Sequence, residues 1–144
     1  MSDNSNKPNV LFWIVGIIGL AWNAMGVNAY IEQAYQTEGY LERTSPEMLE
    51  LATNAPSWVT AVFAIAVFAS ALACILLLLR KKLAKLLFFL GLLAVVIQTI
   101  NSAFTEGVFD IMNTFDLSMF IAIPIVSVFL YMYSKKASEK GWLS

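Results

Sequence analysis

Side chains that could bind a ligand lie close together in one short segment, GLAWNAMGVNAY, residues 19–30. Asn23, Gly26 and Tyr30 recur there every three or four residues and Trp22 adjoins them, so a helix would present them along one side. Aromatic faces combined with amides suit a small neutral polar ligand such as a sugar. An asparagine amide in hydrocarbon also needs a hydrogen-bonding partner, a bond worth about 0.6 to 2 kcal/mol, so we expect Asn23 to face protein rather than lipid.

A second polar stripe lies further along the chain, where Gln98, Asn101 and Thr105 follow one another at helical spacing. We expect this stripe to supply the partner of Asn23. In one interpretation, the two stripes line a cavity that opens to the outside of the membrane. In the other, their amides form hydrogen bonds between helices, and glycines such as Gly19 are close-packing positions. The residues at issue are Trp22, Asn23, Gly26, Tyr30, Gln98 and Asn101.

The residue types that the chain lacks narrow its chemistry. There is no histidine, and the single cysteine, Cys74, lies in an apolar stretch. These facts argue against a histidine metal site, a bis-histidine haem, a disulfide and a Ser-His-acid triad, so we expect neither an enzyme nor a bound metal or cofactor. Proton-coupled transport is also disfavoured, because no acid lies within an apolar span and only Glu32 lies near the end of one. Nothing in the sequence indicates nucleic-acid binding.

The elements that must position these residues are membrane helices. The chain is 59% hydrophobic and only 13% charged, which is too apolar for a soluble domain of 144 residues. Its charge-free runs are each near or above the ~18 residues that mark a spanning helix. The sequence therefore predicts one all-α domain over residues 1–144, an integral membrane four-helix bundle in contact with lipid. The predicted helices are about 9–33, 58–79, 83–103 and 117–133.

Charged residues predict the orientation of this bundle. Arg80 and the lysines near it follow the second span, other lysines follow the fourth, and only Arg43 lies in a connection on the opposite side. The positive-inside rule then places both termini in the cytoplasm. Nearly all of the acids fall in the two outer connections. In the longer of these, Ser45 and Pro46 form a helix-start signal, which predicts a short amphipathic helix that closes the bundle or acts as a lid.

The segment after the fourth span has its own pattern, with lysines followed by Trp142. Lysines attract anionic headgroups, and tryptophan is enriched at membrane interfaces. We expect this segment to anchor the chain at the membrane surface, with docking of a partner as the alternative.

Several short motifs also invite comparison with a known family. They are Trp22-Asn23-x-x-Gly26, Pro56-x-Trp58, Leu79-Arg80-Lys81, Gln98 and Gly141-Trp142-Leu143. Together they resemble a family of small bacterial four-helix inner-membrane proteins, mostly uncharacterised and sometimes loosely labelled sugar transporters. The resemblance implies a multi-pass protein of the bacterial inner membrane, and it adds weight to a ligand cavity.

Two functions remain open. The first is binding or transport of a small polar molecule through an outward-facing cavity; four helices are few for alternating access, so we expect a homo-oligomer. The alternative is a non-catalytic accessory or scaffold subunit of a larger membrane complex, whose polar and small-residue stripes grip a partner's helices. The direction in which the stripe of the first helix points discriminates between them.

Overall fold

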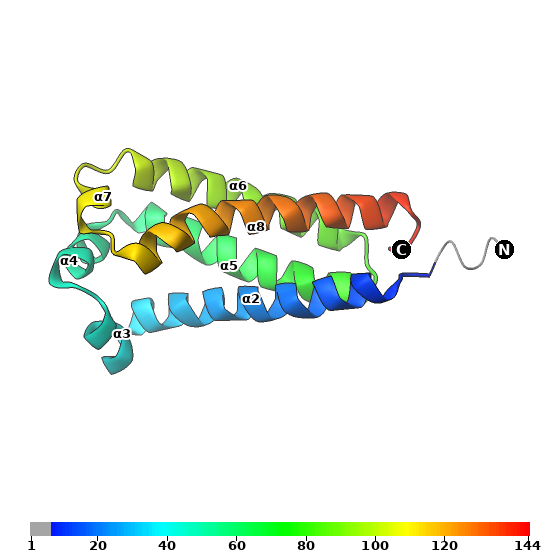
Figure 1. Ribbon diagram of the computed structural model, residues 1–144, viewed down its shortest axis with the longest axis horizontal. Helices are drawn as coiled ribbons and strands as arrows, with labels where there is room; N and C mark the ends of the chain where they lie inside the picture. Colours follow the sequence, from blue (N-terminus) through cyan, green and yellow to red (C-terminus); the bar gives the residue numbers. More distant parts are fainter. Residues whose placement is uncertain (1–6) are drawn as a thin grey trace.

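Four long helices run side by side in the computed structural model, which describes residues 7–144 (Figure 1). They are α2 (Val10–Tyr35), α5 (Ser57–Leu78), α6 (Leu83–Ala103) and α8 (Thr114–Glu139). Each is long and apolar enough to cross a membrane, and the part of the chain that the structure describes contains no strand. The all-α class and the four apolar helices are confirmed; residues 1–6 of the predicted domain lie outside the described residues.

The two ends of the bundle are built differently. At one end, here called the cap end, lie three short helices, α3 (Glu38–Arg43), α4 (Pro46–Asn54) and α7 (Val108–Ile111) (Figure 1). The opposite end, here called the tail end, holds the α5–α6 turn of residues 79–82 and the segment 140–144 after α8. At the start of α4, the Ser45 side chain accepts a hydrogen bond from the Met48 N–H, 3.2 Å away, as expected of an N-cap.

The helix bounds follow the sequence signals closely except in α8. The predictions for α5 and α6 agree with the structure to within one residue, and α2 runs slightly further than expected, to Tyr35. Helix α8 was predicted over 117–133 but spans Thr114–Glu139, with Pro124 inside it. A capping box between Asn113 and Asp116 starts it earlier, and the helix continues past the end of the charge-free run, through Lys135 and Lys136, to Glu139. Hydropathy identifies where a charge-free run ends, but a helix can continue beyond that point.

Helix α5 is central, because it packs against both α2 and α6, while α6 packs in turn against α8. The contact with α6 is close: a Cβ atom added at Gly91 would lie 2.3 Å from the Ser70 Oγ, so a larger residue does not fit there unless Ser70 moves. On the outer surface of the bundle, the helices present large apolar side chains; Ile18 is 64% exposed and Ile121 is 60% exposed. Such faces suit a bilayer better than water.

The core lies toward the tail end. In α2 the buried residues are Phe12, Gly16 and Gly19, all in its first half, and in α8 the first buried residue is Leu130. These residues belong to or adjoin one cluster of buried side chains from all four long helices and the final segment. Its members are Phe12, Ala73, Cys74, Leu77, Ala84, Phe88, Leu130, Ala137, Trp142 and Leu143. The bundle is therefore tightly packed at the tail end and looser toward the cap end.

The Trp142 ring is buried in protein, whereas the sequence predicts a ring exposed at the membrane interface. Its side chain is only 8% exposed, and its ring meets that of Phe12 edge to face at a centroid distance of 5.8 Å. Because residues 141–144 fold back over the α5–α6 turn, the tryptophan side chain closes the tail end of the core. The anchoring prediction was wrong for this residue, since an aromatic after a lysine run has the same sequence signature in either place.

Candidate ligand-binding hollow at the cap end

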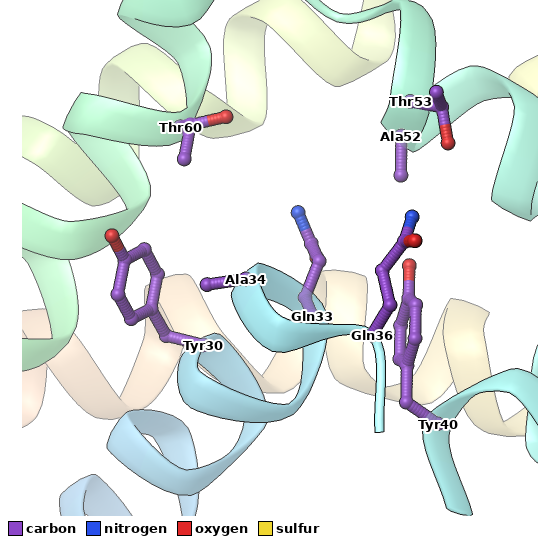
Figure 2. Close-up of a pocket in the computed structure, with 8 residues that line it drawn as sticks. All are labelled: Tyr30, Gln33, Ala34, Gln36, Tyr40, Ala52, Thr53 and Thr60. Carbon is purple, nitrogen blue, oxygen red and sulfur yellow. The ribbon is translucent and has the colours of Figure 1, made fainter. Parts of the chain in front are cut away.

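A hollow of ≈ 260 Å³ lies where α2 ends, between α3, α4 and the start of α5 (Figure 2). The lining residues are Tyr30, Gln33, Ala34, Gln36, Tyr40, Ala52, Thr53 and Thr60. Figure 2 shows the polar ends of Gln33, Gln36 and Tyr40 extending across the space toward Ala52 and Thr53. Most of the lining groups are uncharged hydrogen-bond donors and acceptors, which is the lining that a small neutral polar molecule requires.

A second hollow, of ≈ 570 Å³, adjoins the first and shares Gln33, Tyr40 and Ala52 with it. It is lined by residues of α3, α4 and the start of α8, and the charged side chains of Glu42, Arg43 and Asp116 are among them. The two spaces together are called the cap hollow below. Its combined size falls within the several hundred Å³ that small-molecule sites usually occupy.

The C-terminal turn of α2 positions the amide side chains that line the cap hollow. Gln36 adopts a left-handed φ of 48°, and the N–H of Thr37 donates to the Glu32 carbonyl 3.1 Å away, which closes the helix and turns the chain sideways. The Thr37 side chain then accepts from the Tyr40 N–H, 3.3 Å away, and so begins α3. This turn places Tyr40 opposite the last turn of α2.

An ion pair between Arg43 of α3 and Glu32 of α2 ties the two helices together. The Arg43 side chain is 62% exposed, so the pair contributes little free energy by itself and serves mainly to orient α3. Burial raises the pKa of the Tyr40 phenol, and a hydrogen bond with the Thr44 side chain partly opposes that effect. The phenol is therefore neutral near pH 7 and able both to donate and to accept a hydrogen bond.

Of the site residues predicted from the sequence, Tyr30 lines the cap hollow. Its ring also packs edge to face against Phe63 and Phe68 of α5, at centroid distances of 5.5 and 5.6 Å. These contacts fix the ring between the hollow and the helix surface. Residues 22–26 lie deeper: Asn23 precedes Tyr30 by seven positions, which is about 10 Å along a helix axis.

Asn23 is used for packing. Its side-chain amide donates to the Gly19 carbonyl at 2.9 Å and to the Cys74 Sγ at 3.3 Å, so its partners lie on α2 and α5. Nearby, a Cβ atom added at Gly26 would lie 3.1 Å from the Val67 Cγ1, which shows how closely α2 approaches α5. Trp22 is half-buried beside them.

Gln98 and Asn101 are half-buried on α6 and do not line the cap hollow. The expectation that this stripe partners Asn23 was wrong, because α5 packs between α2 and α6 and offers the Cys74 sulfur instead. Helical periodicity identifies the side of a helix that must face protein, but it does not identify which neighbour stands there.

Sequence reasoning missed Gln36, Tyr40, Thr53 and Thr60, which come from different elements and share no local pattern. Gln33 was not missed in this way, because its helical spacing places it at the end of the stripe of Asn23 and Tyr30. Within residues 7–144, no three Cys, Asp or Glu side chains gather in a way that could hold a metal ion.

Known proteins give no further guide. No protein-family model, curated protein or solved structure matches this chain. The features that bear on function are therefore the residues of the cap hollow and the distribution of charge along the bundle.

That distribution is strongly asymmetric. At the cap end or beside it lie Glu32, Glu38, Glu42, Glu47, Glu50, Glu106, Asp110 and Asp116, with Arg43 as a cation among them. At the tail end lie Arg80, Lys81, Lys82, Lys85, Lys135, Lys136 and Lys140, with Glu139 as an acid among them. The cap hollow thus opens at the acidic end of an apolar bundle, where cations are attracted and anions are repelled.

Proposed function

We propose that this chain is a multi-pass protein of the bacterial inner membrane that binds a small neutral polar molecule, such as a sugar, in the cap hollow. The observation that carries the proposal is the gathering of uncharged hydrogen-bonding side chains from α2, α3, α4 and α5 around one space. Anionic ligands are disfavoured there by the surrounding carboxylates, and the neutral phenol of Tyr40 offers both a donor and an acceptor.

The charge asymmetry supports an orientation in which the cap end faces outward. Basic residues at the tail end belong on the cytoplasmic side by the positive-inside rule, which places both termini of the chain there as well. The cap hollow then receives its ligand from the periplasmic side. In this arrangement α3, which the Arg43–Glu32 ion pair connects to α2, forms a cover over the hollow together with α4.

Transport, as opposed to binding alone, requires more than one copy. The tail end of the single bundle is filled by buried side chains, among them Phe12, Leu77 and Trp142, so no open path continues from the cap hollow through this core. We therefore propose a homo-oligomer, in which a path for the ligand forms where copies meet.

The accessory-subunit alternative loses its main support because the glycine stripe of α2 faces inward. Cβ atoms added at Gly16, Gly19 and Gly26 would meet Leu78, Leu130 and Val67 of the same chain at 2.5, 3.1 and 3.1 Å. The stripe is therefore occupied by the chain's own helices α5 and α8, and it is not available to grip the helices of a partner.

The experiment is a binding screen on the purified protein in lipid nanodiscs, using neutral mono- and disaccharides and following both the thermal unfolding midpoint and native mass spectra. A bound saccharide should raise the midpoint. Gln33→Ala and Tyr40→Phe should each weaken binding about fivefold, because each removes a hydrogen bond worth about 1 kcal/mol. Gln98→Ala is the matched control, since this amide lies outside the hollow. Equal losses for Gln98→Ala and Gln33→Ala, or no binding of any saccharide, would contradict the proposal.

A further inference from the structure

The segment after α8 is hydrogen-bonded to the turn between α5 and α6. The N–H of Ser144 donates to the Arg80 carbonyl at 2.8 Å, and the N–H of Lys82 donates to the Ser144 carbonyl at 3.0 Å. The Nε of Arg80 also donates to the Trp142 carbonyl, 2.8 Å away. Arg80 has a left-handed φ of 59°, which ends α5 and turns its carbonyl toward Ser144. The end of α8 and the α5–α6 turn therefore form one connected surface.

This connection brings two basic groups together. One group belongs to the turn and the start of α6, and the other to the end of α8. Trp142 joins them: the Lys140 Nζ lies 4.8 Å from the centroid of its ring, and Arg80 bonds its carbonyl. The combined surface is called the basic collar below. Its members are Arg80, Lys81, Lys82, Lys85, Lys135, Lys136 and Lys140.

Membrane topology alone accounts for the number of these cations but not for their connection. Basic residues on two separate flexible segments would satisfy the positive-inside rule equally well. Here Trp142 is buried against Phe12, and the backbone bonds of Ser144 hold the two segments in register. The cations are thus displayed on a fixed frame, with Lys81, Lys82 and Lys140 exposed around it. Within residues 80–85 and 135–140, Glu139 is the only acidic residue.

We propose that the basic collar is a binding site for the headgroup of an anionic phospholipid in the leaflet that the tail end faces. Charge complementarity carries the assignment, because lysines at the end of a membrane bundle lie at the level where lipid phosphates are concentrated. Lys81 and Lys82 approach the phosphate from the turn, and Lys140 approaches it from α8. This site is at the opposite end from the cap hollow and does not depend on its ligand.

The test is native mass spectrometry of the full chain released from nanodiscs that contain equal amounts of phosphatidylglycerol and phosphatidylcholine. The protein should retain phosphatidylglycerol selectively. Lys81→Gln, Lys82→Gln and Lys140→Gln together should lower that retention on the order of 100-fold, at about fivefold for each lysine. Replacing the same three lysines with arginine should preserve it. Equal retention of the two lipids by the unaltered protein would overturn the proposal.

Two further experiments distinguish binding at a structured site from attraction by positive charge alone. Trp142→Leu keeps every lysine and the backbone carbonyl that Arg80 bonds, but it removes the ring that lies beneath Lys140 and against Phe12, so phosphatidylglycerol retention should fall at least fivefold in protein whose helical content is unchanged. Unchanged retention in that variant would show that the number of charges suffices, and would refute a built site. If Trp142→Leu fails to fold, the lysine variants still decide whether the basic collar binds the anionic lipid. Inorganic phosphate in excess should not displace the lipid; displacement would assign the site to free phosphate instead.

Discussion

Replacing Trp142 with alanine should destabilise the whole bundle, although this residue follows the last helix. The side chain is 8% exposed, contacts Phe12 edge to face, and belongs to the same buried cluster as Leu77 and Leu130. Removing a buried tryptophan usually costs about 3 to 5 kcal/mol, from lost burial and from the cavity left behind. We expect the equilibrium constant for unfolding to rise by about two to nearly four orders of magnitude.

The assay is equilibrium unfolding in mixed micelles, in which a denaturing detergent is titrated and helical circular dichroism is followed. Trp58→Ala is the matched control, because Trp58 is 50% exposed at the start of α5 and should cost less than about 1 kcal/mol. Trp142→Phe should fall between the two, since it retains much of the buried volume. If Trp142→Ala and Trp58→Ala destabilise the protein equally, then residue 142 lies among headgroups and the packing described for the tail end is incorrect.

Two other substitutions test the role of the stripe on α2 by the same titration. Asn23→Ala removes the hydrogen bond to Cys74 and should cost about 0.6 to 2 kcal/mol while changing saccharide binding less than twofold; a loss of binding as large as that of Gln33→Ala would move the ligand site deeper into the bundle. Gly19→Leu should destabilise by about 1 to 3 kcal/mol or more, because even a Cβ atom there would lie 3.1 Å from the Leu130 Cδ2 and 3.3 Å from the Cys74 Sγ. Gly19→Ala should be nearly neutral, since its better helix propensity offsets the crowding; wild-type stability for Gly19→Leu would mean that α2 packs differently.

Much of the fold could be predicted because it depends on local signals. Long charge-free runs identify the spanning helices, and Pro56 marks where the second of these must begin. The start of α4 follows from Ser45 and Pro46, since capping is decided by a few neighbouring residues. That Asn23 faces protein also follows from its residue type, because an asparagine amide in a membrane helix needs a hydrogen-bonding partner, whereas the neighbour that the stripe contacts does not follow from the sequence.

The features that could not be predicted depend on tertiary contacts. A tryptophan beyond a lysine run has the same sequence pattern in the headgroup region as in a core, so the fold-back of Trp142 left no local signal. The cap hollow combines residues from α2, α3, α4 and α5, and their convergence is set by the left-handed turn at Gln36. The partner of Asn23 was misassigned for the same reason: the order in which helices pack, with α5 central, decides it.

The central claim is that the bundle spans the membrane with the cap hollow on the outer side, and cysteine labelling in intact bacterial cells tests it most directly. Thr53→Cys places a thiol on exposed α4, Glu139→Cys places one at the exposed end of α8, and the native Cys74 is fully buried and serves as the unlabelled background. A membrane-impermeant maleimide should label Thr53→Cys in intact cells and Glu139→Cys only after the cells are lysed. Labelling of Glu139→Cys in intact cells, with Thr53→Cys protected until lysis, would contradict the proposed orientation and, with it, the capture of a ligand from outside.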